Sequence, residues 1–362
     1  MSEVVWKKLE DLLDYEQPSK YIVKSTDYVN RGIPVLTAGQ SFLLGYTEEE
    51  DGVYYADANN PVIIFDDFTT SFHLVCFNFK VKSSALKILF AKNNVNIRLV
   101  YNLMKNISYE PKEHSRQWLS IYSKFEVGLP LSKTQQQAIV NQLDTFTSLI
   151  SRLESELELR QKQYEHYREE LLSFEGDEEV EWKTLGDIGD VAMCKRIFKE
   201  QTQPQGEIPF YKIGTFGKTA DAFISRELYE DFRSKYKYPK IGDILMSASG
   251  SIGRTVVYDG SDAYYQDSNI VWIENDESIV SNKFLRLIYS ITKWNVDNGG
   301  VIARLYNKNI RSTIIPIPRK NRQQQIVDKL DMFEQLIAAL KREIALRKKQ
   351  YTYYREKLLT FE

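Results

Sequence analysis

The sequence predicts an α+β protein in which two globular heads alternate with two long helices. Three observations lead to this fold class: an internal repeat, a heptad pattern inside the repeated segments, and strand-like stretches between them. The expected segments are a first head at 1–130, a first helix segment at 131–175, a second head at 176–317 and a second helix segment at 318–362. A chain of 362 residues is long enough for two separate cores.

The repeat is clearest in the two helix segments. Shifting the chain by 187 positions aligns 131–175 with 318–362, and 24 of the 45 aligned residues are identical. A shorter match, "VVWKKLEDL" from Val4 and "VEWKTLGDI" from Val180, marks the start of each head. The chain therefore consists of a duplicated unit of head and helix.

Apolar residues in each helix segment recur at alternating spacings of four and three. This period, kept for about five heptads, is typical of a coiled-coil seam and requires a partner helix. The other helix segment is the natural partner, and oligomerisation is the alternative. Each helix should begin just past a proline, Pro130 or Pro318. The seam includes Ile139, Leu143, Phe146, Arg160 and Tyr164 in the first segment and Ile326, Leu330, Phe333, Arg347 and Tyr351 in the second.

Arg160 and Arg347 interrupt the two seams at equivalent positions. A polar seam residue can fix the register of two helices at some loss of stability. Alternatively, the aliphatic stem lies along the helix and the charged group reaches water. The sequence leaves both interpretations open.

Between the repeats, both heads mix strands and helices. Residues 60–68 and 72–81 are rich in β-branched and aromatic residues, which predicts strands. "GDILMSASGSIGRTVVY" at 242–258 predicts a strand, a turn of small residues and a second strand, and 281–291 predicts a helix capped by Ser281. "GIPVLTAG" from Gly32 resembles "GEIPFYKIG" from Gly206, although the heads otherwise hardly align.

Charge and composition narrow the function. The net charge is −2, and both heads are slightly acidic, with 14 basic against 16 acidic residues in 1–130 and 18 against 20 in 176–317. Only 318–362 is basic, with 11 against 6. The heads alone would therefore bind DNA phosphates weakly. No signal sequence or membrane span is apparent, so we expect a soluble cytoplasmic protein, and we expect Cys76 and Cys194 to be buried thiols.

The patterns of common enzymes are missing from the sequence. His73, His114 and His166 form no metal-binding spacing, and no phosphate-binding GxxxxGK[ST] loop occurs. Asp66 and Asp67 could serve a metal-dependent nuclease, but adjacent strand residues point to opposite faces, and a turn or surface pair is the ordinary explanation. We expect no catalytic residue, metal site or bound cofactor in this chain.

The strongest local candidate for DNA contact is "SASGSIGR" at 247–254. Its glycines permit close approach of the backbone, its serines suit phosphates or base edges, and its arginine could bind guanine; a hairpin turn is the competing explanation. Gln266 and Asn269 carry amides suited to adenine, although core or turn roles also explain them. The candidates are Thr37, Gln40, Thr69 and Thr70 in the first head and Lys212, Thr215, Ser247, Ser249, Gly250, Ser251, Arg254, Gln266 and Asn269 in the second.

At the start of the helix segments, "PLSKTQQQAIVNQLDTF" from Pro130 and "PIPRKNRQQQIVDKLDMF" from Pro316 closely resemble the specificity subunits of Type I restriction-modification enzymes. "GDILMSASGSIGR" and "GGVIARLYNKNIRSTIIPIP" look like segments of the target recognition domains in that family. The resemblance covers the whole chain. In one respect it is incomplete, because the first head lacks a clear equivalent of "SASGSIGR".

The resemblance implies a subunit without catalytic activity, whose two target recognition domains each read one half of a split double-stranded DNA sequence. It implies an antiparallel coiled coil that sets the spacing and docks two methyltransferase subunits using S-adenosylmethionine. Restriction subunits, two where present, would add ATP- and Mg-dependent translocation and cleavage. A separate specificity subunit of a Type II enzyme, a coiled-coil scaffold that does not read DNA, and an enzyme active in this chain are the alternatives.

Overall fold

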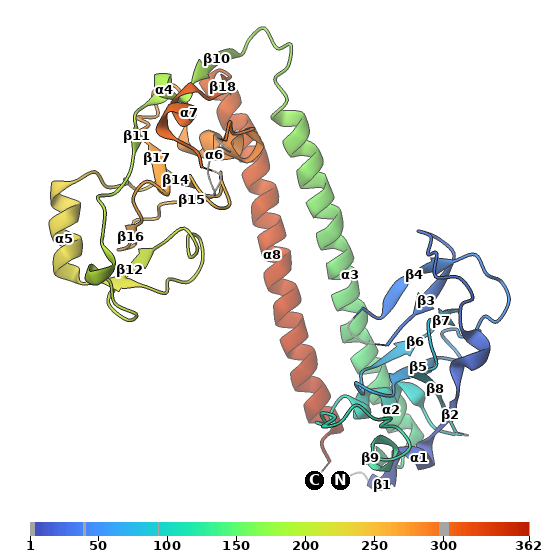
Figure 1. The fold of residues 1–362 in the computed structure, drawn as a ribbon. Coiled ribbons are helices and arrows are strands. Elements are labelled where there is room, and N and C mark those ends of the chain that lie inside the picture. Colours follow the sequence, from blue (N-terminus) through green and yellow to red (C-terminus); the bar gives the residue numbers. More distant parts are fainter. Residues whose placement is uncertain (1–3, 39–40, 93, 297–303, 362) are drawn as a thin grey trace. The chain divides into compact units, whose positions relative to one another are not determined.

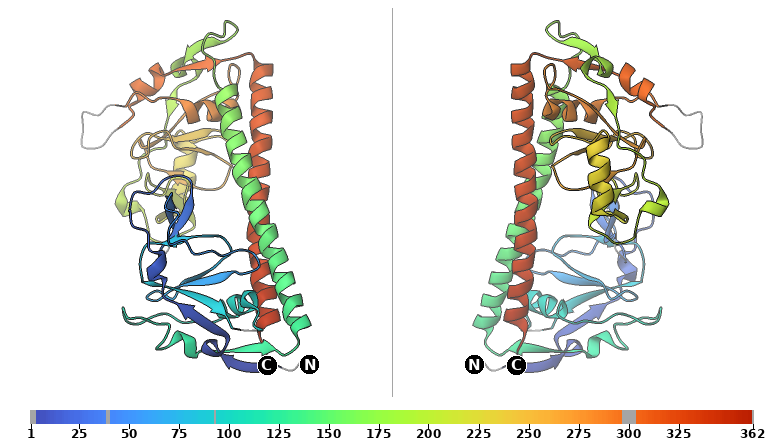
Figure 2. Two further views of the ribbon diagram at one scale, coloured as in Figure 1. Left: turned by 90° about the vertical axis from the view of Figure 1, so that its right-hand side faces the viewer. Right: turned by 90° about the vertical axis from the view of Figure 1, so that its left-hand side faces the viewer.

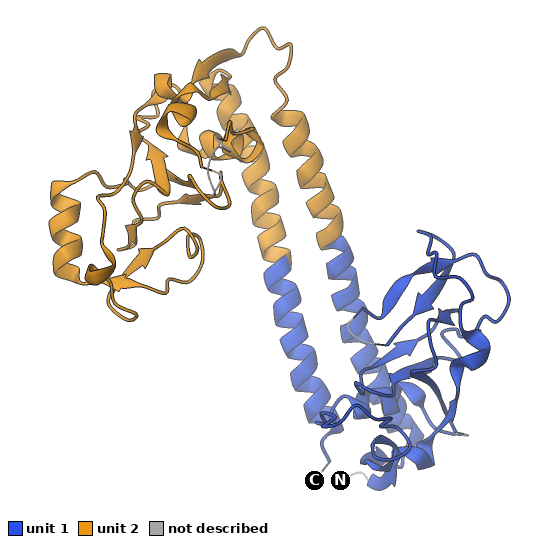
Figure 3. Cartoon of the chain, in the orientation of Figure 1, with its two compact units in different colours: residues 1–156, 341–362 blue, residues 157–340 orange. Residues whose placement is uncertain are grey.

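The computed structural model describes residues 4–38, 41–92, 94–296 and 304–361. The chain divides into two compact units, which are coloured separately in Figure 3. Unit 1 comprises residues 1–156 and 341–362, and unit 2 comprises residues 157–340. Each unit therefore contains one head together with a segment of each long helix.

The two long helices are α3 (Lys133–Leu171) and α8 (Lys320–Leu359), labelled in Figure 1. Both begin two or three residues past the predicted prolines, so this prediction is confirmed. With 39 and 40 residues, each is about 60 Å long at 1.5 Å per residue. A buried glutamine secures each start, because Gln136 Nε2 donates to the Pro130 carbonyl at 2.6 Å and Gln323 Nε2 to the Pro318 carbonyl at 2.9 Å.

Within each unit, a segment of α3 lies beside a segment of α8 and runs in the opposite direction, as Figure 2 shows from two sides. In unit 1, Phe146 stacks on Tyr354 with ring centroids 5.4 Å apart. In unit 2, Phe333 stacks on Tyr167 at 5.3 Å. Because these are equivalent residues of the repeat, the same aromatic contact is made twice, as an antiparallel pair of duplicated helices requires.

The first seam residues of each helix serve the adjoining head as well as the partner helix. Ile139 and Leu143 belong to the head core of unit 1, which also takes in Leu359 from the end of α8. Ile326 and Leu330 belong to the equivalent core of unit 2, against which Tyr164 of α3 packs. At the start of each helix, the apolar residues of the heptad pattern therefore pack against the adjoining head as well as against the other helix.

The seam arginines bond along their own helices. Arg160 Nη1 donates to Gln163 Oε1 at 2.8 Å, and Arg347 Nη1 donates to Gln350 Oε1 at 2.9 Å. Arg347 also pairs with Glu343, one turn earlier, at 2.7 Å. These contacts match the interpretation in which the aliphatic stem lies along the helix.

In the described residues, the strands of head 1 form a four-stranded, a three-stranded and a two-stranded sheet. The four-stranded antiparallel sheet has the order β2 (Leu13–Glu16), β8 (Leu86–Ala91), β5 (Val62–Asp66), β6 (Phe72–Val75). The three-stranded sheet has the order β4 (Leu43–Thr47), β3 (Ile33–Leu36), β7 (Lys80–Val81), with β3 parallel to β7. The remaining elements are β1 (Val4–Lys8) paired with β9 (Glu126–Pro130), α1 (Leu9–Leu12), α2 (Ile97–Met104) and the 3-10 turns η1 (Pro18–Tyr21) and η2 (Tyr122–Lys124).

Head 2 contains the same set of sheets. Its four-stranded antiparallel sheet has the order β11 (Val191–Ala192), β17 (Ile270–Ile273), β14 (Ile244–Ser247), β15 (Thr255–Val257). Its three-stranded sheet has the order β13 (Phe223–Ile224), β12 (Ile208–Tyr211), β16 (Tyr264–Tyr265), with β12 parallel to β16. The remaining elements are β10 (Glu181–Thr184) paired with β18 (Ile314–Ile317), α4 (Leu185–Ile188), α5 (Arg226–Lys235), α6 (Asn282–Ile291), α7 (Asn307–Ser312) and η3 (Lys199–Gln201).

The strands of the two heads correspond one to one in chain order. Strands β2 to β8 pair in the same order and directions as β11 to β17. The predicted match between the segments that begin at Gly32 and Gly206 is confirmed, because Ile33 and Ile208 both open the central strand of a three-stranded sheet. The duplication thus includes the heads, in which the residues have diverged while the strand order has not.

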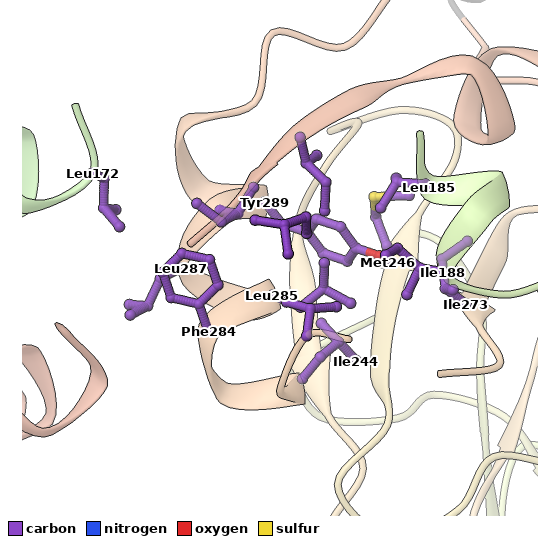
Figure 4. Packing of buried hydrophobic residues seen from close by; sticks show 14 of the residues in the cluster. Leu172, Leu185, Ile188, Ile244, Met246, Ile273, Phe284, Leu285, Leu287 and Tyr289 are labelled. Atoms are coloured by element: carbon purple, nitrogen blue, oxygen red, sulfur yellow. The ribbon is translucent and has the colours of Figure 1, made fainter. Parts of the chain in front are cut away.

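The core of unit 2 forms between the four-stranded sheet and the helices that cover it. Met246 of β14, Ile273 of β17, Leu185 of α4 and Phe284 of α6 belong to one cluster. Figure 4 shows Leu185, Met246 and Ile273 close together, with Phe284 on the side of Leu172. Helix α6 starts as predicted, with the Ser281 hydroxyl accepting from the Phe284 N–H at 3.3 Å. This packing fixes the end of β14, where the strongest candidate loop begins.

One prediction about side-chain burial is wrong, because Cys76 is exposed, whereas Cys194 is buried as expected. Of the two ordinary explanations for Asp66 and Asp67, the turn is confirmed, because both lie at the β5–β6 turn. A surface pair is not, because both side chains are buried. The sequence could not show this, because Cys76 directly follows the end of β6 and the partners of Asp67 are more than fifteen residues away in the chain.

Candidate nucleic-acid interface

The loop at 247–254 joins β14 to β15, as predicted for a hairpin. Ser247 is buried and holds the loop closed: its hydroxyl donates to the Ser251 carbonyl at 2.5 Å and accepts from the Arg254 N–H at 2.9 Å. Ser251, at the tip, is exposed. Ser247 is therefore a framework residue of the loop, and Ser251 is the hydroxyl that it offers to solvent.

The two glycines of this loop have different neighbours. Both have positive φ, 64° at Gly250 and 81° at Gly253, a conformation that favours glycine. A Cβ at Gly253 would lie 2.6 Å from Trp294 Nε1, so this glycine allows close packing inside the protein. Gly250 is exposed, and a Cβ there would meet only Ile213 at 3.6 Å. Gly250 is thus the position at which another molecule could approach the backbone.

The candidate amides lie on the next connection, between β16 and β17. Asn269 Oδ1 accepts from the Ser249 hydroxyl at 2.9 Å, and Gln266 Oε1 accepts from the Ile213 N–H at 3.0 Å. In each case the amide oxygen already holds a neighbouring loop. Within the part of the chain that the structure describes, the amide nitrogens donate no hydrogen bond, so they are the groups left for an outside acceptor.

The remaining candidates of head 2 lie on the loop after β12. Thr215 closes this loop, because its hydroxyl accepts from the Lys212 N–H at 3.1 Å. Lys212 Nζ pairs with Asp221 at 2.8 Å, with both side chains substantially exposed. The Arg254 guanidinium donates to the Phe216 carbonyl at 2.9 Å, which ties this loop to the β14–β15 loop.

Three loops far apart in the sequence therefore meet at one end of the head 2 sheets. We call residues 212–218, 247–254 and 266–269 together with Arg304 the head 2 edge. Sequence reasoning missed Arg304, whose guanidinium donates to the Ser268 carbonyl at 3.2 Å and lies over the Tyr306 ring. The only sequence signal was its presence in the family-like segment "GGVIARLY", of which 299–303 lie outside the described residues.

In head 1, Thr69 and Thr70 lie in the β5–β6 turn. Asp66 caps this turn, accepting from the Phe68 N–H at 2.9 Å and from the Thr69 hydroxyl at 2.5 Å. Thr69 is exposed, whereas Thr70 is buried with a positive φ of 61°. Thr37 donates its N–H to the Phe42 carbonyl at 2.9 Å and follows β3. Gln40 lies outside the described residues.

Asp67 is committed to the interior of head 1. Its carboxylate lies 3.2 Å from Lys87 Nζ, and both side chains are 1% exposed. It also accepts from the Trp118 N–H at 2.8 Å. Within the described part of the chain, the Oδ2 atom of Asp67 has the ion pair with Lys87 but no hydrogen bond. Among the described residues, no group of three or more His, Cys, Asp or Glu side chains is placed to hold a metal ion.

Comparisons with known proteins place the chain in a family. The profile of the Type I restriction modification DNA specificity domain matches residues 177–346. The specificity subunit of an Escherichia coli type I restriction enzyme is 37% identical over 99% of this chain and 95% of its own length. A Haemophilus influenzae protein provisionally named a type I restriction enzyme specificity subunit is 41% identical over 99% of this chain and 96% of its own length. The chain belongs to the type I specificity subunits.

A solved type I specificity subunit has the same fold. The S subunit of the type I restriction-modification system of M. genitalium matches with a TM-score of 0.66 at 14% identity, covering 100% of this chain and 97% of its own. A chain from a structure of a type I restriction-modification system, described in terms of complex assembly, matches with a TM-score of 0.52 at 15% identity over 98% and 96% of the two chains. The matches favour a type I specificity subunit over the Type II and scaffold alternatives. Among the described residues, no helix is long and apolar enough to cross a membrane.

Proposed function

We propose that this type I specificity subunit reads a bipartite double-stranded DNA sequence, with each head contacting one half-site. The observation that carries the proposal is the contrast between shared topology and different surface residues. The strand order of the heads is the same, but the loops at the corresponding ends carry different side chains. Readers of two different half-sites need one framework and two sets of base contacts.

The reactions would take place in partner subunits. Methyltransferase subunits would transfer methyl groups from S-adenosylmethionine to adenine, and restriction subunits would use ATP and Mg. Family membership supports this division, and the carboxylates of Asp66 and Asp67, the most enzyme-like pair of the sequence, are occupied by the fold of head 1. With DNA as the target, we place the assembly in the cytoplasm.

Two methyltransferase subunits would dock on the long helices, one on each copy of the repeat. A partner that binds twice needs the same surface twice. Leu159 of α3 and Leu346 of α8 are equivalent residues of the repeat, and they are 59% and 60% exposed. The same exposed leucine at the same place in both copies of the repeat is what a partner that binds twice would use.

DNA affinity would depend on these partners. Head 1 carries 14 basic and 16 acidic residues and head 2 carries 18 and 20, so neither supplies an excess of positive charge for phosphate binding. We therefore expect the isolated chain to bind DNA weakly, and the complex with methyltransferase subunits to bind it tightly.

The experiment that tests the function is mapping of adenine methylation in cells that contain the methyltransferase partner, with and without this chain. We expect removal of the chain to abolish methylation at one bipartite motif. Replacing residues 176–317 by the corresponding head of a relative should alter one half-site and leave the other unchanged. Unchanged methylation after removal of the chain, with an active partner, would rule out a role in DNA targeting.

A further inference from the structure

Strand registers identify the part of head 1 that corresponds to the head 2 edge. Phe65 pairs with Lys87 across β5 and β8, as Met246 pairs with Val271 across β14 and β17. The next residue closes the hairpin in both heads: the Asp66 N–H donates to Ser71, and the Ser247 N–H donates to Arg254. The β5–β6 turn therefore corresponds to the 247–254 loop, with two fewer residues.

The connection from β7 to β8 aligns without a gap to the connection from β16 to β17. The Lys82 N–H donates to the Leu36 carbonyl at 2.9 Å, as the Gln266 N–H donates to the Tyr211 carbonyl at 2.9 Å. Counting on by three residues places Ala85 opposite Asn269. These two carbonyls accept equivalent bonds, from the Asp67 N–H at 3.0 Å and from the Ala248 N–H at 2.8 Å.

The same hydrogen-bond pattern pairs Arg116 with Arg304. The Gln117 N–H donates to the Asp67 carbonyl at 2.8 Å, and the Leu305 N–H donates to the Ala248 carbonyl at 2.8 Å. From this point, residues 116–130 align without a gap to 304–318, ending at Pro130 and Pro318. Within the aligned stretch only the arginine and the proline are identical.

The two arginines are held beside their turns by different contacts. Arg116 is half exposed and lies 4.0 Å from the buried carboxylate of Asp67. Arg304 is partly exposed, bonds the Ser268 carbonyl and lies over the Tyr306 ring. The arginine is identical in the two heads, whereas the residues that contact it differ. If its role were internal to the head, we would expect its partner to be identical as well. We therefore infer that it binds a molecule outside the head.

The chemistry of DNA explains why the two heads could share this arginine while the residues around it differ. Phosphates are the same in every sequence, whereas base edges differ between half-sites. A contact to phosphate can therefore remain identical in both heads while the surrounding base contacts diverge. Lys82, which is exposed, stands where head 2 has Gln266, and Ser71 stands where head 2 has Arg254.

We propose that Arg116 and Arg304 make the same DNA phosphate contact in the two half-sites. We also propose that the exposed Lys82 and Thr69, on the loops of head 1 that correspond to 266–269 and 247–254, belong to its DNA-reading surface. This inference rests on the proposed function and extends it to the head whose contacts the sequence left unassigned. Phosphate contacts of this kind position the protein on the duplex and leave the choice of bases to their neighbours.

The test uses the complete complex with methyltransferase subunits and DNA that carries the mapped motif. Arg116→Ala and Arg304→Ala should each weaken binding about tenfold at moderate salt, and each should lower the dependence of log K on log salt by about one. The methylated motif should keep its letters. The controls are Lys7→Ala and Lys183→Ala, at equivalent positions of β1 and β10. They should change neither the affinity for DNA nor its salt dependence.

Further variants separate a contact with DNA from damage to the head. Arg116→Lys should recover most of the affinity, because it keeps the charge, and the melting temperature of the Arg116→Ala complex should match the wild type. Lys82→Gln should change the letters accepted at one half-site only. An unchanged salt dependence in Arg116→Ala, or altered motif letters in that variant, would refute the proposal even if the wild-type complex reads its motif. Failure of the wild-type complex to select any motif would instead refute the proposed function.

Discussion

A buried ion pair in head 1 has an apolar counterpart in head 2. Asp67 and Lys87 occupy the positions that Ala248 and Val271 occupy in the other head, and all four side chains are almost fully buried. The same backbone accommodates the ion pair and the apolar pair, because the attraction between two buried opposite charges offsets the cost of removing them from water. This compensation requires both charges. Removing one partner leaves a buried charge without compensation.

We predict that Asp67→Ala destabilises the protein by about 3–5 kcal/mol, the usual effect of breaking a buried pair. The double variant Asp67→Ala with Lys87→Val, which copies the residues of head 2, should regain most of this loss. Part of the loss should remain, because the Trp118 N–H loses its acceptor. Chemical denaturation of the purified chain measures both values, and a double variant no more stable than Asp67→Ala would contradict the prediction.

The pKa of Lys105, which directly follows α2, is shifted far enough to link its titration to stability. Burial and the nearby Arg355 lower the pKa of Lys105 to about 8. Its ammonium lies 3.2 Å from the Tyr351 hydroxyl and 4.3 Å from the centre of the Tyr101 ring. Burial and the charge of Lys105 also lower the pKa of the His73 imidazole.

The lowered pKa of Lys105 predicts the sign of a pH effect. Between about pH 8 and the ordinary value of 10.5, the unfolded chain binds a proton that the folded chain has released, so stability rises with pH in this window. The unfolding free energy of the wild type, measured relative to Lys105→Met, should therefore rise by about 1 kcal/mol between pH 7.5 and 9.5, allowing for solvent screening. Unfolding free energies at the two pH values test this, and a difference independent of pH would contradict it.

Among the elements, the helices carry the most regular information. Their period, starting points and aromatic seam residues were predicted from the sequence, and the contacts of Phe146 with Tyr354 and of Phe333 with Tyr167 confirm them. The sequence could not separate seam positions that meet the other helix from those that enter a head, because both require apolar residues at the same spacing. Leu159 and Leu346 are equivalent apolar residues of the repeat whose side chains stay exposed, covered neither by the other helix nor by a head.

We predict that Leu159→Asp and Leu346→Asp each weaken the binding of one methyltransferase subunit by about 10- to 100-fold, the loss of one buried leucine contact. The double variant should bind neither subunit. Ser155→Asp, an exposed change at a position where the repeat differs, is the matched control. Mass measurement of complexes at nanomolar concentration distinguishes the species, and full assembly of the double variant would contradict the docking proposal.

For the whole molecule, the duplication explains why one chain can address two DNA sequences. Each unit repeats the same strand order and the same helix contact, while the loops at the corresponding ends of the sheets carry different residues. If the helices set the distance between half-sites, their length and the choice of bases are independent properties. A change in one should leave the other unaffected.

We predict that inserting four residues into α3 after Glu156, about one helical turn or 6 Å, changes the permitted spacer by one or two base pairs. The letters of both half-sites should stay the same. Methylation mapping of cells carrying the variant measures both features at once. An unchanged spacer with full activity, or new letters in a half-site, would count against a spacing role for the helix.

The sequence by itself determined the repeat, the two long helices, the mixed heads and the family. These features follow from periodicity and from motifs that lie within short stretches of chain. It also singled out most residues of the head 2 edge as candidates, because "SASGSIGR" at 247–254 and the nearby pair Gln266 and Asn269 are compact patterns. It could not show that Ser247 and Gly253 serve the framework, since their partners lie elsewhere in the fold.

Only the tertiary structure decided which residues of the two heads correspond. Outside the helices the heads hardly align, so no residue pattern links Arg116 with Arg304 or the β5–β6 turn with the 247–254 loop. Backbone hydrogen bonds between strands depend on register and tolerate almost any side chain, and they kept this correspondence after the side chains diverged. The buried ion pair of Asp67 with Lys87 and the exposure of Cys76 also became apparent only in the folded chain, because burial depends on which segments pack together.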